Sequence, residues 1–552
     1  MTNVSIPHEP ILRSIGAIAD ELGLETYAVG GAVRDALLRR ATTDLDFVSV
    51  GPGSGIALAK AVAKALGGTT AHIYKNFGTA GVHLPQADGE PLVLEFVGAR
   101  KESYARDSRK PVVEDGTLED DQRRRDFTVN ALAISLNSLP RFGGADKFGE
   151  LLDPFGGLND LGMGLLRTPL DPLKTFEDDP LRMLRAARFA TQLGFEIVKE
   201  TFDAMKEMAG RIEIVSQERI TDELQKIVAA PVPSEGFKIL YAADLLELIF
   251  PELTALAGVE IVDGQKHKDN FFHTLQVLDN LCATQRDAGL VEDRAQGNVL
   301  WLRWAALLHD IAKPDTKRFS HTQGWTFHGH EDLGSRKHVP RVFRRMKLPL
   351  GDPLRYVQEM VRLHHRPVAL VDDNVTDSAV RRLLFDAGEG VDDLMMLVRA
   401  DITSKNPGRV RRYLSAFDHV EARMRKVEEK DQLRAFQPPV DGNEIMKVLG
   451  VGAGVAVGIL KTWIREAILD GDIPNEHDPA HAYMMEHKNE ALRRGALFEE
   501  ILKTLQGPER AAMGAIKEAV FRDEIPDEHD EAVAYLHRVK ETTLSSGESH
   551  AS

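Results

Sequence analysis

Tyr27-Ala-Val-Gly-Gly-Ala-Val-Arg-Asp-Ala-Leu-Leu38, followed by Asp44-Leu-Asp-Phe-Val-Ser-Val50, is the stretch of sequence that decides the fold of the N-terminal region. Its apolar pattern predicts a strand over residues 26–29, a Gly-Gly turn, a helix over residues 32–40 and then a second strand. Such a turn lets backbone N–H groups and a helix N-terminus face a phosphate, and Arg34 can add a charge-assisted contact. A Gly-Gly pair before a helix is common, so the turn alone is a weak sign of phosphate binding.

Two carboxylates lie on the second of these strands. Asp44 and Asp46 are two positions apart, and side chains at i and i+2 of a strand project from the same face. They repel one another unless a cation lies between them, which suits Mg²⁺ that bridges the phosphates of a nucleotide. A solvated edge strand is the alternative interpretation. Glu95, on a predicted strand over residues 92–97, is either a third carboxylate at the metal or an outward-facing glutamate.

The rest of the N-terminal region alternates helices with short strands. The sequence predicts helices over residues 10–24 and 55–67 and further strands over residues 69–74 and 79–84. Residues 98–120 are polar and lack an apolar period, so we expect a long loop there.

The fold class expected from these patterns is α+β and mostly α. A small mixed sheet forms the N-terminal head, and beyond Pro180 the apolar pattern is helical almost throughout. The expected domains are, in order, a head over residues 1–160, a helical neck over residues 161–230, an all-α domain over residues 231–430, a helical tail over residues 431–490 and a helical C-terminal extension over residues 491–552.

Composition narrows the class of protein. The 552 residues include 69 Lys and Arg against 85 Asp and Glu, a net charge of −16, which excludes a protein that only coats nucleic acid but allows an enzyme with a local basic groove. A single cysteine, Cys282, excludes an intramolecular disulfide and a cysteine-based zinc site. The N-terminus has no signal-peptide pattern and no apolar stretch reaches about 18 residues, so we expect a cytoplasmic protein without a membrane span.

Three further segments carry a resemblance to a known family. They read Arg124-Arg-Asp-Phe-Thr-Val-Asn-Ala-Leu-Ala133, Asp178-Asp-Pro-Leu-Arg-Met-Leu-Arg-Ala-Ala-Arg-Phe189 and Gln217-Glu-Arg-Ile-Thr-Asp-Glu-Leu224. Together with the two N-terminal segments, they resemble in order and spacing the class II tRNA nucleotidyltransferases and bacterial poly(A) polymerases, a branch of the polymerase-β-like superfamily. The resemblance covers residues 25–230 and implies a nucleotidyltransferase head followed by a neck that selects the nucleobase.

The resemblance also implies roles for individual residues. Asp44 and Asp46 would bind Mg²⁺ and catalyse the transfer, and Gly31 and Arg34 would hold the triphosphate. The further nucleotide-binding residues that it implies are Arg125, Asp126 at the ribose, Asp179, Arg182, Arg185 and Arg188.

The last four of these residues are spaced by three, so that on a helix they form one stripe. A carboxylate and a guanidinium offer the acceptor and the donors that the Watson–Crick edges of C and A require. By resemblance, Asp179 and Arg182 read the base, while Arg185 and Arg188 support them or contact phosphate. Without the resemblance, such a stripe is more typical of a solvated helix face.

Histidines are concentrated between residues 267 and 365. Their pattern, with an adjacent His-Asp pair after an apolar segment, resembles an HD domain, the all-α metal-dependent phosphohydrolase fold, within residues 231–430. The resemblance implies metal ligands at His273, His309, Asp310 and Asp401, with His330 and His364 available to a second metal. Imidazole and carboxylate ligands suit Mn²⁺, Ni²⁺, Fe²⁺ or Mg²⁺. Lone histidines in helices are usually structural, so an inactive HD domain is the alternative.

The C-terminal part contains an internal repeat. Residues 464–483 and 516–535 share a pattern at an offset of 52 residues, which predicts a duplicated helix–turn–helix unit. Residues 441–490 resemble the tail segment of the family, which contacts tRNA in relatives. The polar residues 541–552 are expected to be disordered.

The expected function is addition of the 3′-terminal CCA to tRNA from CTP and ATP, with release of pyrophosphate and, where the HD domain is active, a second phosphohydrolase activity. Poly(A) polymerases usually carry an Arg-rich stretch after the metal strand, whereas residues 72–78 hold one basic residue, Lys75. CC-adding enzymes tend to have a shortened loop before the Arg-Arg-Asp motif, and residues 98–121 are long. A poly(A) polymerase, an A-only or CC-only enzyme and an HD phosphohydrolase with a vestigial head stay open as alternatives.

Overall fold

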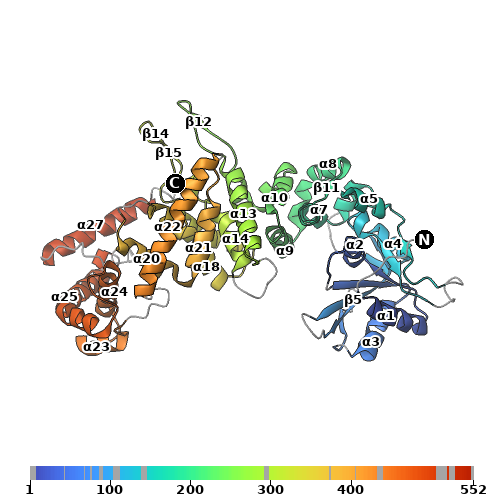
Figure 1. Cartoon of the computed structure of the whole chain (residues 1–552), viewed down its shortest axis with the longest axis horizontal. Coiled ribbons are helices and arrows are strands. Elements are labelled where there is room, and N and C mark those ends of the chain that lie inside the picture. Colours follow the sequence, from blue (N-terminus) through green and yellow to red (C-terminus); the bar gives the residue numbers. More distant parts are fainter. Residues whose placement is uncertain are drawn as a thin grey trace. The chain divides into compact units, whose positions relative to one another are not determined.

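The computed structural model (Figure 1) describes the following residues: 8–42, 44–67, 69–74, 78–85, 91–103, 112–138, 146–290, 298–371, 375–404, 406–431, 439–504, 517, 519–520 and 529–548. They belong to two compact units, Met1–Arg362 and Leu363–Ser552. The division lies inside residues 231–430, which the sequence analysis assigns to one domain. The domain limits drawn from the sequence therefore stay predictions.

A seven-stranded mixed sheet forms the head. Its strands, in spatial order, are β3 (His72–Tyr74), β4 (Thr79–Leu84), β5 (Leu92–Gly98), β2 (Asp44–Ser49), β1 (Thr26–Val29), β8 (Ala133–Ser135) and β9 (Leu151–Leu152). β2 and β5 pair in parallel, and the other neighbours are antiparallel. The small mixed sheet expected from the alternating residues is confirmed, with strand ends that differ by a few residues.

The helices of the head lie on both sides of the sheet. They are α1 (Glu9–Leu22), α2 (Gly31–Leu37), α3 (Ser54–Leu66) and α4 (Leu118–Arg123). α3 packs on β2, β4 and β5, and Figure 1 shows α1 and α3 on the opposite side of the sheet from α2. Phe47 of β2 is buried and stacks on Phe96 of β5 with ring centroids 4.9 Å apart. Because neighbours along a strand alternate in direction, Asp44 and Asp46 face away from this core.

The segment expected as a long polar loop contains secondary structure, so that prediction is wrong. β6 (Arg100–Ser103) and β7 (Val112–Asp115) form an antiparallel hairpin, and α4 follows it. Lys101 lies opposite Glu114 in the hairpin register, and oppositely charged cross-strand pairs stabilise a ladder that lacks an apolar face. Residues 104–111 lie outside the described part of the chain.

Beyond the head, the first unit is mostly helical, as the sequence predicts. Its helices are α5 (Gly157–Met163), α6 (Pro172–Asp178), α7 (Leu181–Leu193), α8 (Lys199–Glu207), α9 (Gln217–Val228), α10 (Pro233–Ala242), α11 (Leu245–Ile249), α12 (Pro251–Thr254), α13 (Asn270–Asp287), α14 (Val299–Leu308), α15 (Lys313–Thr316), α16 (His330–Leu333), α17 (Val339–Arg345) and α18 (Asp352–Leu363). A short parallel pair, β10 (Leu165–Leu166) with β11 (Glu196–Ile197), and two hairpins interrupt them. α7 packs against both α9 and α10 in the neck.

The single cysteine, Cys282, lies on α13 and is 1% exposed. Burial raises the pKa of its thiol to about 12, and the thiolate is the reactive form. We therefore expect iodoacetamide to alkylate the folded protein at least about 10³-fold more slowly than a free thiol at mildly alkaline pH. Intact-mass spectrometry before and after unfolding in guanidinium chloride checks this. Rapid alkylation of the folded chain would contradict it.

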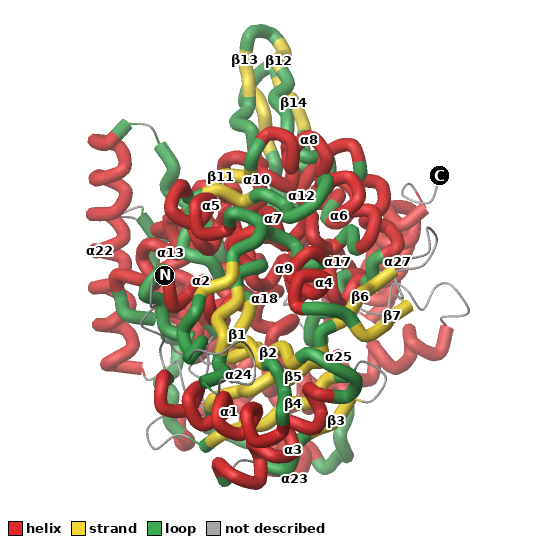
Figure 2. The backbone as a smooth tube through the Cα atoms, turned by 90° about the vertical axis from the view of Figure 1, so that its right-hand side faces the viewer, coloured by secondary structure: helices red, strands yellow, loops and turns green. Residues whose placement is uncertain are grey.

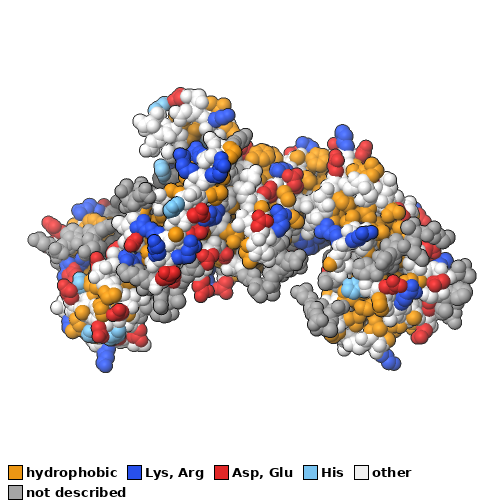
Figure 3. Space-filling model, viewed as in Figure 1, with side chains coloured by type: hydrophobic (Ala, Val, Ile, Leu, Met, Phe, Trp, Pro, Cys, Tyr) orange, Lys and Arg blue, Asp and Glu red, His pale blue; other side chains and the backbone are white. Residues whose placement is uncertain are grey.

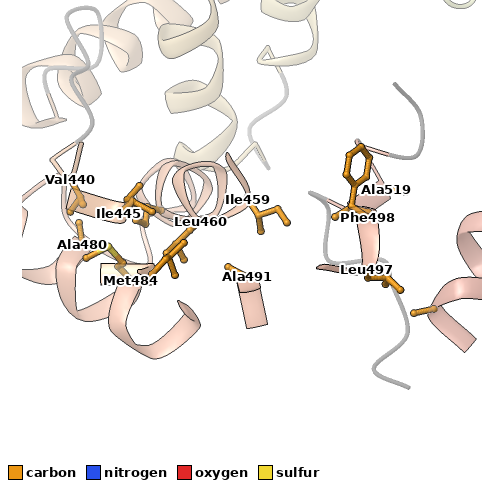
Figure 4. Close-up of a cluster of buried hydrophobic side chains, with 14 of the residues drawn as sticks. Val440, Ile445, Ile459, Leu460, Ala480, Met484, Ala491, Leu497, Phe498 and Ala519 are labelled. Atoms are coloured by element: carbon orange, nitrogen blue, oxygen red, sulfur yellow. The ribbon is translucent and has the colours of Figure 1, made fainter. Parts of the chain in front are cut away.

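The second unit is helical in its described residues. Its helices are α19 (Arg366–Ala369), α20 (Asp377–Ala387), α21 (Val391–Ala400), α22 (Pro407–Asp431), α23 (Gly442–Leu449), α24 (Val455–Asp470), α25 (His477–Thr504) and α27 (His529–Glu548). Figure 4 shows part of the apolar core of its C-terminal helices, with Ile445, Leu460 and Met484 close together. No described helix of either unit is long and apolar enough to span a membrane.

The two copies of the internal repeat begin a helix at equivalent positions. α25 begins at His477 and α27 begins at His529, 52 residues later. Residues 521–528, the turn of the second copy, lie outside the described residues, so the duplicated helix–turn–helix stays a prediction. α27 continues through residues 541–548, where the sequence predicts disorder, and that part of the prediction is wrong. No proline or glycine interrupts the helix before its last turn.

Candidate active site

A cavity of about 770 Å³ opens between the carboxylate-bearing face of the sheet and the neck. It brings together every head and neck residue that the resemblance implies. Those that line it are Gly31, Arg34, Asp44, Asp46, Arg125, Asp126, Asp179, Arg182, Arg185 and Arg188. Residues more than a hundred positions apart in the sequence therefore face one space.

Three carboxylates meet at one end of the cavity. Asp46 is opposite Val29 in the β1–β2 register and opposite Glu95 in the parallel β2–β5 register, so Glu95 lies beside Asp46 on the same face. Glu95 and Asp44 also line the cavity. Burial raises the pKa of Asp46 to about 6; Arg125 opposes this shift, and the negative charges of Glu95 and Asp44 add to it. A crowded carboxylate of raised pKa fits a divalent cation, which would relieve the repulsion.

The turn before α2 depends on glycine at position 30. Gly30 has φ +75° and ψ −138°, which side-chain-bearing residues rarely adopt. A Cβ at Gly30 would lie 2.8 Å from an Arg125 nitrogen and 3.3 Å from Asp46 Oδ2. The backbone therefore passes so close to both side chains that only a glycine fits.

Gly30→Ala is expected to destabilise the fold by about 1–3 kcal/mol through backbone strain and to weaken nucleotide binding, because Arg125 and Asp46 must move. Urea unfolding together with calorimetric titration of ATP measures the two effects. Gly23→Ala is the matched control, because Gly23 also has a positive φ (+68°) but a Cβ there would meet nothing within 4 Å. Unchanged ATP affinity in Gly30→Ala would contradict the role of the turn.

A chain of hydrogen bonds joins α2 to the neck. Arg34 Nη1 donates to Asn130 Oδ1 at 2.7 Å, and Asn130 Nδ2 donates to Asp126 Oδ1 at 2.9 Å. Arg185 Nε donates to Asp126 Oδ2 at 2.7 Å. Although burial opposes it, the Arg185 guanidinium and these hydrogen bonds hold the pKa of Asp126 well below its usual range. Asn130, which the sequence analysis did not single out, is the link between the two arginines.

Of the expected stripe, only Arg182, Arg185 and Arg188 lie on α7. Asp179 precedes the helix in an extended conformation (φ −142°), so the prediction of one helical stripe is wrong for this residue. The arginine stripe is not a solvated helix face. Arg182 and Arg188 are 9% and 8% exposed. Arg182 donates to the carbonyl oxygens of Thr175 at 3.2 Å and Arg124 at 2.5 Å, and Arg188 pairs with Glu223 of α9 at 3.2 Å. Burial lowers the pKa of Arg188 to about 10, an effect that Glu223 opposes.

Arg219 of α9 is a cavity residue that the sequence analysis missed. Its guanidinium donates to Asp179 Oδ2 at 2.9 Å, across 40 residues of sequence, and it lines the cavity. Asp179 therefore pairs with Arg219 and not with Arg182. The only sign in the sequence was that Arg219 lies inside the Gln217–Leu224 segment. The resemblance includes that segment but implies no role for any single residue in it.

A second titratable cluster surrounds Asp310, at the end of α14. His309 Nε2 and His330 Nε2 each lie 3.3 Å from an Asp310 oxygen, and His273 Nε2 lies 3.6 Å away. Lys313 Nζ donates to Asp310 Oδ2 at 2.6 Å. His309 and Lys313 hold the pKa of Asp310 well below its usual range, although burial opposes this.

A backbone carbonyl oxygen fixes the ring orientation of two of these histidines. Nδ1 of His309 lies 2.7 Å from the carbonyl oxygen of Ala306, and Nδ1 of His330 lies 2.7 Å from that of Phe327. With the proton on Nδ1, the lone pair is on Nε2, which points to Asp310. A backbone carbonyl commonly fixes a metal-binding imidazole in this way.

The other two residues implied for this site belong to the second unit. His364 directly follows α18 and is 1% exposed, and Asp401 follows α21 and is partly buried. Their place in the ligand set stays a prediction from the sequence.

Comparisons with known proteins agree with this arrangement. The family described as Poly A polymerase head domain matches residues 26–167, the probable RNA- and SrmB-binding site of polymerase A matches residues 194–256, and the HD domain matches residues 270–386. The solved structure titled "The complex structure of CCA-adding enzyme with ATP" has a TM-score of 0.56 at 22% identity and covers 88% of this chain and 95% of its own, which supports the fold.

Two curated relatives carry the assignment further. The A-adding tRNA nucleotidyltransferase of Deinococcus radiodurans is 32% identical over 456 residues, which are 81% of this chain and 92% of that protein. The multifunctional CCA protein of Neisseria gonorrhoeae is 34% identical over 334 residues, 59% of this chain and 70% of that protein. The chain therefore belongs to the family of tRNA nucleotidyltransferases and poly(A) polymerases with an attached HD domain, and it is a nucleotidyltransferase enzyme.

Proposed function

We propose that this enzyme completes the 3′ end of tRNA by adding CCA from CTP and ATP, with release of pyrophosphate. The observation that carries the proposal is that the carboxylates Asp44 and Asp46 and the base-reading candidates Asp179 and Arg182 line one cavity. A nucleotide held there would have its triphosphate at the turn before α2 and its base against the neck. The Deinococcus radiodurans relative is a tRNA nucleotidyltransferase, which supports tRNA as the acceptor.

The reaction joins the RNA 3′-oxygen to the α-phosphorus of the nucleotide and breaks the bond from that phosphorus to pyrophosphate. Asp44 and Asp46 would hold Mg²⁺, which would supply charge neutralisation and lower the pKa of the 3′-hydroxyl. Gly31 and Arg34 hold the triphosphate through backbone N–H groups and a guanidinium. The chain's contribution is therefore chiefly positioning and electrostatic stabilisation.

Base selection falls to Asp179 and Arg182. Asp179 offers acceptors and Arg182 offers donors, and their partners hold both side chains in place: Arg219 holds Asp179, and two backbone carbonyls hold Arg182. Arg125 and Asp126 line the same cavity and are assigned to the nucleotide and its ribose. Arg185 and Arg188 are assigned to support of this surface.

An enzyme that adds only the terminal A is the second candidate. It is favoured by the Deinococcus radiodurans relative, which the match covers over 92% of its length. Lys75, whose isolation in the sequence argues against a poly(A) polymerase, lies outside the described residues.

Transfer assays on three tRNA acceptors separate these candidates. One acceptor ends at the discriminator base, the second carries one added C, and the third carries two. Each is incubated with labelled CTP or ATP. A CCA-adding enzyme incorporates C into the first two and A into the third, whereas an A-adding enzyme labels only the third. Long A tails on any RNA would identify a poly(A) polymerase, and no incorporation with Mg²⁺ present would overturn the proposal.

We also propose that His273, His309 and Asp310, with His330 and the predicted ligands Asp401 and His364, would hold a divalent metal, which would activate water for phosphoester hydrolysis. Support comes from the Asp310 cluster and from the HD match over residues 270–386. His309→Ala is expected to abolish metal-dependent hydrolysis of a nucleoside 2′,3′-cyclic phosphate and to leave nucleotide transfer within about twofold, because the two clusters share no residue. Loss of both activities would count against separate sites.

A further inference from the structure

Two hairpins of the first unit lie side by side and form one projecting arm. They are β12 (Ile261–Val262) with β13 (Gln265–Lys266), and β14 (Arg318–Ser320) with β15 (Gly324–Thr326). Figures 1 and 2, at right angles, both show them projecting together. Trp325 Nε1 donates to the carbonyl oxygen of Gln265 at 3.2 Å, and a Cβ at Gly324 would collide with the Gln265 side chain. Residues 258–268 and 317–327 are called the paired arm below.

Aromatic rings lie along the paired arm without being buried. The Trp325 ring centroid is 5.2 Å from those of Phe319 and His267, and His267 is 6.1 Å from Phe327. All four rings keep a share of their surface exposed. Lys317 Nζ lies over Trp325 at 5.4 Å. A hydrophobic core would bury these rings, whereas here each residue is only partly buried.

The paired arm is basic, although the chain carries a net charge of −16. It carries four Lys and Arg residues against two acidic residues. Of the acidic residues, Glu260 pairs with Lys317 and Asp263 lies 2.9 Å from His321 Nδ1. The exposed cations on the arm are Lys266, Lys268 and Arg318. Figure 3 shows Lys, Arg and His atoms on this projection.

The paired arm is joined to the Asp310 cluster at its base. β14 follows α15, which begins at Lys313, and the chain leaves β15 through Phe327 to reach His330. Lys313 Nζ bonds to Asp310 and lies 5.5 Å from the centroid of the Phe327 ring. The base of the arm therefore adjoins the cluster.

We propose that the paired arm binds single-stranded RNA, with bases stacked on Trp325 and Phe319 and phosphates against Lys266, Lys268 and Arg318. Aromatic faces accept any base, and neighbouring cations follow the backbone, which is how sequence-tolerant single-strand surfaces work. This surface is separate from the transfer cavity and would lead a strand to the Asp310 cluster.

Photo-crosslinking locates the RNA directly. The full-length enzyme is irradiated with a short single-stranded RNA that contains 4-thiouridine and is then digested with trypsin. Cleavage after Arg318 and Arg336 places the three arm aromatics in one peptide, residues 319–336. We expect crosslinks in that peptide, with loss in Trp325→Ala and retention in Trp325→Phe. Crosslinks confined to peptides of the head, neck and tail would overturn the proposal.

Charge variants test the same surface without disturbing the rings. Lys266→Gln/Lys268→Gln is compared with Lys60→Gln/Lys64→Gln, which removes the same charge from exposed positions of α3. The arm variant is expected to reduce crosslinking to peptide 319–336 about tenfold. The slope of log affinity against log salt concentration, which is negative, should become shallower by about 1.4, because two phosphate contacts are lost. The α3 variant is expected to match the wild type. Equal yields of that peptide in both variants would show that the arm is not a cationic RNA surface.

Discussion

Asp46→Asn is expected to reduce nucleotide incorporation into tRNA at least about 10³-fold, because a metal-bound carboxylate supplies several kcal/mol of transition-state stabilisation. Asp46 occupies the centre of the carboxylate group, opposite Glu95 across the parallel pair and two positions from Asp44. The measurement is single-turnover incorporation of labelled nucleotide with Mg²⁺ in excess. Activity within tenfold of the wild type would remove Asp46 from the reaction centre.

Thermal unfolding in EDTA shows whether Asp46→Asn acts on chemistry or on folding. The pKa of Asp46 is raised to about 6 from its ordinary value of 3.8, so the folded state binds this proton more tightly than the unfolded chain. The contribution to stability is therefore full below about pH 4 and is lost as pH rises through about 6. Above pH 6 the asparagine variant, which carries no charge, should unfold at a higher temperature than the metal-free wild type. A lower unfolding temperature would mean that the lost activity reflects misfolding.

Arg185→Ala is expected to have the largest effect on stability, about 3 kcal/mol, because it leaves a buried carboxylate without its cation. Asp126 is 6% exposed, and Arg185 pairs with it at 2.6 Å while remaining one-third exposed itself. We place this expected loss of stability at the low end of the range for buried ion pairs, because the Arg185 side chain is partly exposed. Urea unfolding of the first unit, followed by tryptophan fluorescence, measures it, and a loss below about 0.5 kcal/mol would contradict it.

A double variant isolates the charge pair. In Asp126→Asn/Arg185→Ala neither charge remains, so part of the stability lost in Arg185→Ala should return. The pKa of Asp126 is lowered in the folded state, so its contribution is present above about pH 4 and is lost at lower pH. The wild type should therefore lose more stability than the double variant as the pH falls below about 4. Identical acid sensitivity would argue that the pair is not a source of stability.

Local periodicity determined much of the head. The alternation of Asp44 to Val50 predicted a strand with both aspartates on one face, and that strand and that face are observed. The Gly-Gly turn and the following helix are also observed. These features depend on neighbours a few residues away, so a single sequence is sufficient to predict them.

The same locality explains the failures. The hairpin of β6 and β7 has charged cross-strand pairs and no apolar face, so its sequence resembles a loop until the two strands meet. The role of Glu95 stayed open because only the parallel register of β5 with β2 places it beside Asp46. Register across a crossover is a property of the whole sheet, and no residue pattern within β5 contains it.

The sequence by itself therefore determined which side chains are available: two aspartates on one strand face, three arginines on one neck helix, and a His-Asp pair after an apolar helix. Only the tertiary structure decided how they are used. It pairs Asp179 with Arg219, turns Arg182 onto two carbonyl oxygens, and joins two distant hairpins into the paired arm. The physical reason is that a charge in a partly buried cavity takes whichever partner the packing brings within hydrogen-bond distance, and packing is set by contacts between residues far apart in the chain.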